Sequence, residues 1–306
     1  MLATRLTTGL TLVVVLSAIL IGDEYLAPWY PLWFVASLGV MTLCALEVVG
    51  LLAASGNRPS PSTVVGGIAA LVAANWVPHL VEPIFRAAAA AGAGPAAPDP
   101  SAAVTVMAWP LWTFVAVLMA TFLAQSFRFR APGSTMTTIA ATTLALAYVG
   151  LLGGFIIQMR WLDGPYHGLI PLALLVATAK GSDTGAYTVG RIAGRTKLWP
   201  TLSPNKTVEG ALGGLLFGVG AALGVSAVAR FALHAPCLDW GPTVGFGLVV
   251  ALVAQLGDLM ESMIKRDSER KDASSSVPGF GGLLDVMDSL LFAAPVAYGF
   301  WVWFNP

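Results

Sequence analysis

The sequence is poor in charged residues: Asp, Glu, Lys and Arg make up only 10% of its 306 residues, and the formal net charge is zero. Soluble domains carry about 25% charged residues, so this composition excludes an ordinary soluble globule. A neutral chain also lacks the basic excess of nucleic-acid-binding proteins, and nucleic acid is excluded as the main partner. Hydrophobic residues make up 57% of the chain and the mean hydropathy is +0.77. Together these values indicate a membrane protein.

Cysteine and histidine are also scarce, with two cysteines and three histidines. Cys44 and Cys237 lie far apart in the sequence, and their spacing fits neither a disulfide framework nor a zinc motif. The histidines are isolated from one another, which indicates structural or interfacial roles.

Long apolar runs dominate the chain. A helix of about 20 residues crosses about 30 Å of hydrocarbon, and the runs are continuously apolar rather than alternating, which favours helices over a barrel. We therefore expect an all-α, polytopic integral membrane protein with about nine transmembrane helices. The runs cover about residues 6–22, 31–54, 62–81, 102–126, 135–157, 167–188, 209–232, 241–264 and 283–304. The third contains Pro78, and the sixth contains Lys180 and Asp183.

The distribution of Lys and Arg predicts the orientation in an inner or plasma membrane. With the N-terminus in the cytoplasm, twelve basic residues lie on the inner side: Arg5, Arg58, Arg128, Arg130, Arg191, Arg195, Lys197, Lys206, Lys265, Arg266, Arg270 and Lys271. Only Arg86, Arg160 and Arg230 then lie outside. Loops 189–208 and 265–282 become cytoplasmic, and the C-terminus lies outside.

Two regions are expected. Residues 1–160 form N-terminal transmembrane helices that serve as a scaffold and offer surfaces for dimer or lipid contacts. Residues 161–306 form a catalytic transmembrane region, because the two longest polar loops and most of the acidic residues within spans lie there.

Placing an acidic residue near the centre of a membrane helix costs free energy. The acidic residues of the last two spans are therefore expected to have a functional or structural role. Helical spacing puts four polar residues on one face of the eighth span: Asp258, Glu261, Ser262 and Lys265. Asp285 and Asp288 begin the ninth span, where the helix dipole favours carboxylates. Such an oxygen-rich site suits Mg²⁺. A structural salt-bridge network with Lys265 or Arg266 explains the pattern equally well.

Glycine-rich turns accompany these charges at 182–185, 203–207 and 278–282. Glycine permits close backbone approach to a phosphate, and Lys, Ser and Thr supply donors. A P-loop is absent. The glycines of the seventh span are interpreted instead as helix-packing positions: Gly213, Gly214, Gly218 and Gly220.

The stretch from Glu261 to Asp288 resembles the signature of phosphatidate cytidylyltransferases, also called CDP-diacylglycerol synthases. The matching positions are Ser262, Lys265, Arg266, Lys271, Asp272, Pro278, Gly279, Gly281, Gly282, Asp285 and Asp288. A second block also matches, at Asp183, Gly185, Tyr187, Gly190, Arg191, Lys197, Pro200, Ser203, Pro204, Lys206, Thr207 and Glu209. The resemblance covers about residues 175–304.

The resemblance implies a Mg²⁺-dependent enzyme that converts CTP and phosphatidate into CDP-diacylglycerol and pyrophosphate, working among membrane lipids. Together with the helical spacing of the acidic residues, it implies metal ligands at Asp258, Asp285 and Asp288, and catalytic residues at Lys265, Arg266, Lys271 and Asp272. The nucleotide and substrate residues would be Asp183, Arg191, Ser203, Lys206, Thr207, Glu209, Ser262, Gly281 and Gly282. A second, monovalent cation and a homodimer are both left open.

Two positions depart from the family signature: Phe280 replaces a histidine and Val286 an arginine. These departures leave open a cytidylyl transfer to another lipid phosphate, or an inactive scaffold. A membrane transporter is a further alternative, although transporter sites usually lie near the midplane between repeats, and no repeat is evident. The aspartate pattern of CDP-alcohol phosphotransferases is absent.

Overall fold

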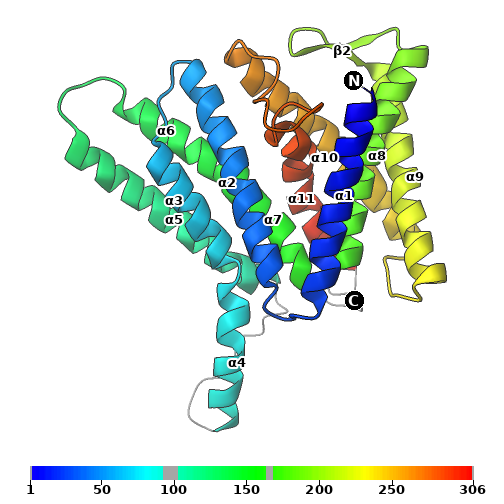
Figure 1. Ribbon diagram of the computed structural model, residues 1–306, viewed down its shortest axis with the longest axis horizontal. Helices are drawn as coiled ribbons and strands as arrows, with labels where there is room; N and C mark the ends of the chain where they lie inside the picture. The colour runs from blue at the N-terminus through cyan, green and yellow to red at the C-terminus, as the bar shows by residue number, and fades with distance from the viewer. Residues whose placement is uncertain (1, 92–102, 163–167, 305–306) are drawn as a thin grey trace. The chain divides into compact units, whose positions relative to one another are not determined.

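Helices make up 78% of the computed structural model, which describes residues 2–91, 103–162 and 168–304 (Figure 1). The chain divides into two compact units, Met1–Ile157 and Gln158–Pro306. The boundary expected from the sequence lies close to this, at residue 160. All of the candidate site residues belong to the second unit.

The first unit is a helical bundle. Its elements are α1 (Leu2–Glu24), α2 (Pro31–Ala54), α3 (Pro61–Ala74), α4 (Val77–Ala90), α5 (Ala103–Arg128), α6 (Thr135–Ala145), the π-helical η1 (Leu146–Leu151) and α7 (Leu152–Gln158). α2 packs on α3, and α3 packs on α5 and η1. Fully buried aliphatic side chains fill these contacts, among them Val48, Leu51, Ile68, Leu71 and Leu146.

The second unit packs four long helices around a polar centre. Its elements are the 3-10 helix η2 (Met159–Trp161), α8 (Leu169–Ala193), β1 (Lys197–Trp199), β2 (Ser203–Thr207), α9 (Val208–Ala227), the π-helical η3 (Val228–Ala232), α10 (Trp240–Asp267) and α11 (Leu284–Phe304). α8 packs against α9, α10 and α11, and α10 packs against α9 and α11.

Between α8 and α9 the chain forms a two-stranded antiparallel hairpin, in which Lys197 pairs with Thr207 and Trp199 with Ser203. The sequence predicted only a loop here. The Lys197 ammonium donates to the Pro204 carbonyl (2.7 Å) and holds the strands together. Because α9 starts directly after β2, the hairpin lies at the end of both helices (Figure 1).

Glycines allow α9 to approach its neighbours closely. A Cβ atom added at Gly213 would lie 2.5 Å from the Val189 Cβ of α8, and one added at Gly218 would lie 2.6 Å from the Ala251 Cβ of α10. Gly214 is similarly tight, with the Gln255 amide at 2.6 Å. The predicted packing role is confirmed at these three positions. It is wrong for Gly220, which has nothing within 4 Å.

Seven helices of the described residues are long and apolar enough to cross a membrane. They cover Thr7–Glu24, Pro31–Ala54, Val106–Arg128, Thr135–Trp161, Val208–Ala232, Trp240–Asp267 and Leu284–Phe304. The chain is therefore an all-α, polytopic integral membrane protein. The expected count of about nine is not confirmed, because α3 has only 14 residues and α8 carries Lys180, Asp183 and Arg191.

The third expected span, 62–81, is wrong as a single helix. α3 ends at Ala74, and the Asn75 side chain donates to the Leu71 carbonyl at 2.7 Å, occupying an acceptor at the end of the helix. The chain then turns and α4 begins at Val77, with Pro78 in its first turn. Proline is favoured in a first turn because its missing N–H has no helical partner there. The side-chain hydrogen bond of Asn75 and the proline at position 78 thus divide the expected span into two helices.

Candidate active site

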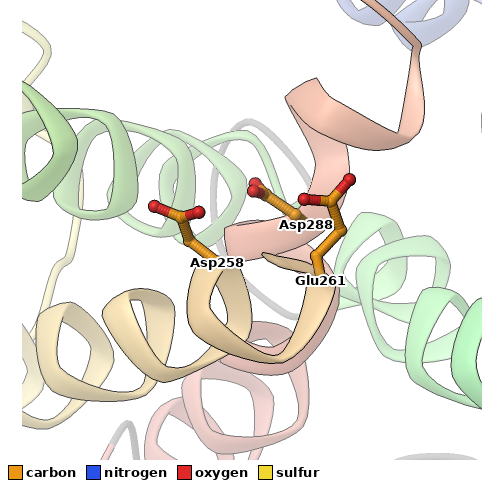
Figure 2. Close-up of side chains that lie close together, drawn as sticks. All are labelled: Asp258, Glu261 and Asp288. Carbon is orange, nitrogen blue, oxygen red and sulfur yellow. The ribbon is translucent and has the colours of Figure 1, made fainter. Parts of the chain in front are cut away.

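Three carboxylates meet where α10 and α11 pack together. Asp258, Glu261 and Asp288 each offer an oxygen atom, and these atoms lie within 4.8 Å of one another. In the view of Figure 2, the carboxylate of Asp288, from α11, lies between those of Asp258 and Glu261, from α10. Glu261 and Asp288 are buried and Asp258 is half-buried. We call this group the carboxylate cluster.

Two lysines neutralise part of the carboxylate cluster. Lys206, from β2, forms an ion pair with Asp258 in which the nitrogen and oxygen atoms are 2.8 Å apart. Lys265 follows Glu261 by one helical turn and pairs with its carboxylate. The hairpin and the end of α10 therefore both supply charge to the same place. Within the described residues, the Glu261 Oε1 atom has no hydrogen-bond partner, so a buried acceptor stays available for a ligand.

Asp285 has a different set of partners from the carboxylate cluster. Its Oδ1 atom accepts from the Lys265 ammonium at 2.6 Å. Its Oδ2 atom accepts the backbone N–H groups of Ala273 (2.9 Å) and Gly282 (2.6 Å). One carboxylate thus links two points of the 268–283 loop, Ala273 and Gly282, to Lys265 at the end of α10.

Gly281 makes this fastening sterically feasible. Its φ of +104° lies in a region that L side chains rarely adopt, and a Cβ atom there would lie 2.8 Å from the Asp285 Oδ2 atom. Val277 and Gly281 also form an isolated β-bridge. The loop therefore presents its backbone closely to the carboxylate of Asp285, while the Phe280 ring is 39% exposed.

α8 contributes a third lysine. The Lys180 ammonium donates to the Asp183 carboxylate (3.1 Å) and to the Ser289 hydroxyl of α11 (3.0 Å). Ser289 follows Asp288, whose carboxylate interacts electrostatically with Lys180, Asp183 and Asp258. Charged groups from α8, α10, α11 and β2 therefore converge on one centre.

Thr207 and Glu209 stabilise the start of α9. The Thr207 hydroxyl accepts from the Gly210 N–H at 3.1 Å as an N-cap. The Glu209 carboxylate accepts the backbone N–H groups of Arg195 and Thr196, both at 3.1 Å. Both side chains therefore shape the backbone that carries Lys206.

The structure brings together only part of the predicted site. The predicted residues that take part in the contacts of the centre are Asp183, Lys206, Asp258, Lys265, Gly282, Asp285 and Asp288. Ser262 follows Glu261 on α10, and Gly281 precedes Gly282 in the loop. Arg191 instead bonds to the Tyr187 hydroxyl at 3.0 Å, and Arg266 to the Leu202 carbonyl at 3.4 Å. Ser203, Lys271 and Asp272 show no contact with the carboxylate cluster among the contacts of the described chain.

The three carboxylates that lie close enough together to hold one ion differ by one member from the predicted metal ligands: Glu261 is among them and Asp285 is not, so the ligand role of Asp285 stays a prediction. Asp285 is not among them because it is occupied by Lys265 and two backbone N–H groups. Glu261 lies three residues after Asp258, so the helical spacing carried the signal for it. The salt-bridge alternative is also realised in part, through Lys265.

The profile of the cytidylyltransferase family matches residues 3–304. Among curated proteins, the chain is 37% identical over 164 residues to the phosphatidate cytidylyltransferase of Bacillus subtilis strain 168, covering 54% of this chain and 58% of that one. It is also 37% identical over 198 residues to that of a Synechocystis strain, covering 56% and 65%. The alignments thus span little more than half of these relatives. Because the family profile covers nearly every residue, the chain belongs to the cytidylyltransferase family.

Proposed function

We propose that this protein transfers the cytidylyl group of CTP to phosphatidate, giving CDP-diacylglycerol and pyrophosphate. Family membership and the names of the relatives in Bacillus and Synechocystis support the reaction. The observation in this chain that carries the proposal is the carboxylate cluster, Asp258, Glu261 and Asp288, flanked by Lys206 and Lys265. Such a centre is suited to the charge of a nucleoside triphosphate and its counter-ion.

The residues present fit a divalent cation. All three members of the carboxylate cluster are oxygen donors, which hard cations such as Mg²⁺ prefer. The buried Glu261 Oε1 atom, which has no hydrogen-bond partner in the described part of the chain, would be free to coordinate the cation. Asp258, Glu261 and Asp288 would hold the ion. When bound, Mg²⁺ would offset part of the triphosphate charge at the reacting phosphorus.

The reaction needs positioning more than proton transfer. An oxygen of the phosphatidate phosphate attacks the α-phosphorus of CTP, and the bond to the β-phosphate breaks as pyrophosphate leaves. A phosphate monoester is already anionic near neutral pH, so no strong general base is required. Lys206 and Lys265 keep the carboxylates in place. The exposed cations Arg191, Arg266 and Lys271 remain our candidates for the phosphates.

The other predicted roles belong to this proposal too. Asp272 would act in catalysis, and the nucleotide would contact Asp183, Ser203, Thr207, Glu209, Ser262, Gly281 and Gly282. For Thr207 and Glu209 the role would be indirect, since both stabilise the start of α9. The orientation with loops 189–208 and 265–282 in the cytoplasm is part of the proposal, because CTP is cytosolic.

A purified-protein assay tests the proposal. Protein in detergent is given CTP, phosphatidate and Mg²⁺, and pyrophosphate release is followed together with the lipid product. We expect both products in equal amounts, and none when phosphatidate is omitted. Release of neither product from CTP and phosphatidate, by protein that is monodisperse, would contradict the proposal.

A second acceptor is included because Phe280 and Val286 depart from the family signature. The same assay is run with another lipid phosphate of equal chain length. Faster pyrophosphate release with that acceptor than with phosphatidate would change the substrate while keeping the cytidylyl transfer.

A further inference from the structure

Lys180 is a cation within a helix that packs inside the second unit. It lies near the middle of α8, whose 25 residues are otherwise largely apolar over the first half. Its ammonium is bonded on α8 to Asp183 (3.1 Å) and across the helix interface to Ser289 of α11 (3.0 Å). Ser289 is fully buried and Lys180 is half-buried. One bond within α8 and one bond to α11 fix the position of this charge.

The charges around the centre do not balance. Among the described residues, five carboxylates converge there: Asp183, Asp258, Glu261, Asp285 and Asp288. Three ammonium groups accompany them: Lys180, Lys206 and Lys265. In their ionised forms these groups leave an excess of two negative charges, which is the charge that one divalent cation neutralises.

Each of the three lysines forms ion pairs with different carboxylates. Lys206 serves Asp258, and Lys265 serves Glu261 and Asp285. The remaining two acids, Asp183 and Asp288, are therefore left to Lys180, which interacts with both. Without Lys180, the excess at this centre would be three negative charges instead of two.

We infer that Lys180 is a positioning residue that acts as a fixed internal cation and matches the carboxylate cluster to one divalent cation. It acts through Asp183 and Asp288 rather than on a substrate. The inference rests on the cation site of the proposed function, but not on the nucleotide chemistry. Removing a fixed positive charge from a site of low dielectric strengthens the attraction for a mobile cation, so its loss raises cation affinity.

The test measures Mn²⁺ binding to the purified full chain in detergent, without nucleotide, by electron paramagnetic resonance. We expect the wild type to bind one Mn²⁺ per chain. Lys180→Met should lower the Mn²⁺ Kd about tenfold or more, whereas Lys180→Arg, which keeps the charge, should leave it within about threefold. A merely structural loss would weaken binding, so the direction of the change separates the two explanations.

Charge compensation gives the second arm. Asp183→Asn should raise the Kd, and the double variant Lys180→Met with Asp183→Asn should return it to within about threefold of the wild type. If Lys180→Met does not fold, comparing Asp183→Asn with the double variant still tests the inference. Arg128→Met, which removes one exposed positive charge from α5 in the first unit, is the matched control and should not change the Kd.

An unchanged or higher Kd in Lys180→Met, or a double variant that fails to approach the wild-type Kd, overturns the inference. A wild type that binds no Mn²⁺ also overturns it. A chain that binds Mn²⁺ as expected but releases no pyrophosphate leaves the inference standing and contradicts only the proposed function.

Discussion

Asp258 and Asp285 are both paired with a lysine, yet the rest of their surroundings differ. Asp258 belongs to the carboxylate cluster and bonds to Lys206 of the hairpin. Asp285 accepts two backbone N–H groups of the 268–283 loop in addition to Lys265. A carboxylate that satisfies backbone donors organises a loop, whereas one that faces other carboxylates favours a cation. Substituting the two residues should therefore affect cation binding and turnover to different extents.

Substituting these aspartates separates the two roles. Asp258→Asn should weaken Mn²⁺ binding more than about tenfold and abolish turnover, because the proposed cation site loses one of its charged ligands. Asp285→Asn should weaken Mn²⁺ binding less than Asp258→Asn does, because it removes a charge from the centre but no member of the carboxylate cluster, and it should lower turnover because the loop loses its anchor. Mn²⁺ titration and pyrophosphate release measure the two effects, with Asp239→Asn as a control, since that carboxylate is 87% exposed and bonds to Arg230 away from the cluster. Equal loss of Mn²⁺ binding in both variants would contradict this division.

The 278–282 loop gives a second prediction at the scale of residues. Gly281→Val should abolish activity, because a β-branched side chain is strained at a φ of +104° and would collide with the Asp285 Oδ2 atom. Phe280→His should change activity by less than about tenfold, equivalent to ~1.4 kcal/mol of barrier, because the Phe280 ring is partly exposed. Initial rates of pyrophosphate release compare the two. If Gly281→Val left activity unchanged and Phe280→His raised it strongly, the loop would contribute to activity through the side chain at position 280 and not through its backbone.

At the scale of elements, α9 connects the hairpin to the rest of the second unit. Its first turn is capped by Thr207, and its glycines bring it close to α8 and α10. Lys206 lies two residues before α9, so the position of the helix determines whether this lysine reaches Asp258. Close helix packing is thereby linked to the electrostatics of the site.

Two glycines of α9 test this packing. Gly213→Ala should destabilise the protein, since overpacking costs about 1–3 kcal/mol and exceeds the gain in helix propensity of about 0.5–1 kcal/mol. Gly220→Ala, in the same helix with nothing within 4 Å, keeps the gain without the clash and should be neutral or stabilising. Thermal unfolding in detergent measures both variants. Equal unfolding temperatures would mean that α8 and α9 can move apart to accommodate the added methyl group at little cost in free energy.

At the scale of the whole molecule, the proposed orientation puts the 268–283 loop and the η3–α10 connection on opposite sides of the membrane. α10 has 28 residues, a length of about 42 Å at 1.5 Å per residue, which is enough to separate its ends across a bilayer. Access to the loop therefore reports on the side of the membrane from which the proposed substrate CTP would bind.

Cysteine labelling tests the orientation. In a Cys237→Ser background, where the remaining Cys44 is buried, an impermeant thiol reagent added to intact cells should label His234→Cys and not Ser275→Cys. Both positions are exposed, so access differs only by membrane side. Lysed cells serve as the control, since there both should react. Labelling of Ser275→Cys in intact cells would show that the loop lies outside the cell, which contradicts the proposed topology. The site would then lie on the opposite side of the membrane from cytosolic CTP.

The sequence by itself determined the helical class and most of the helices. A continuous apolar run in a membrane must satisfy its own backbone hydrogen bonds, so it forms a helix whatever surrounds it; α2 begins and ends where the apolar run 31–54 does. The same local rule put Asp258, Glu261 and Lys265 on one face of α10, because spacings of three and four residues fix neighbours on a helix. The pairing of Lys265 with Glu261 follows from that spacing alone.

Only the tertiary structure decided which carboxylates meet across helices. Asp285 and Asp288 are equally acidic in the sequence, but the packing of α11 on α10 buries Asp288 beside Asp258 and turns Asp285 towards Lys265 and the loop backbone. The bonds of Lys180 to Ser289 and of Lys206 to Asp258 join residues 109 and 52 positions apart. No local pattern encodes such contacts, because they depend on how whole helices pack.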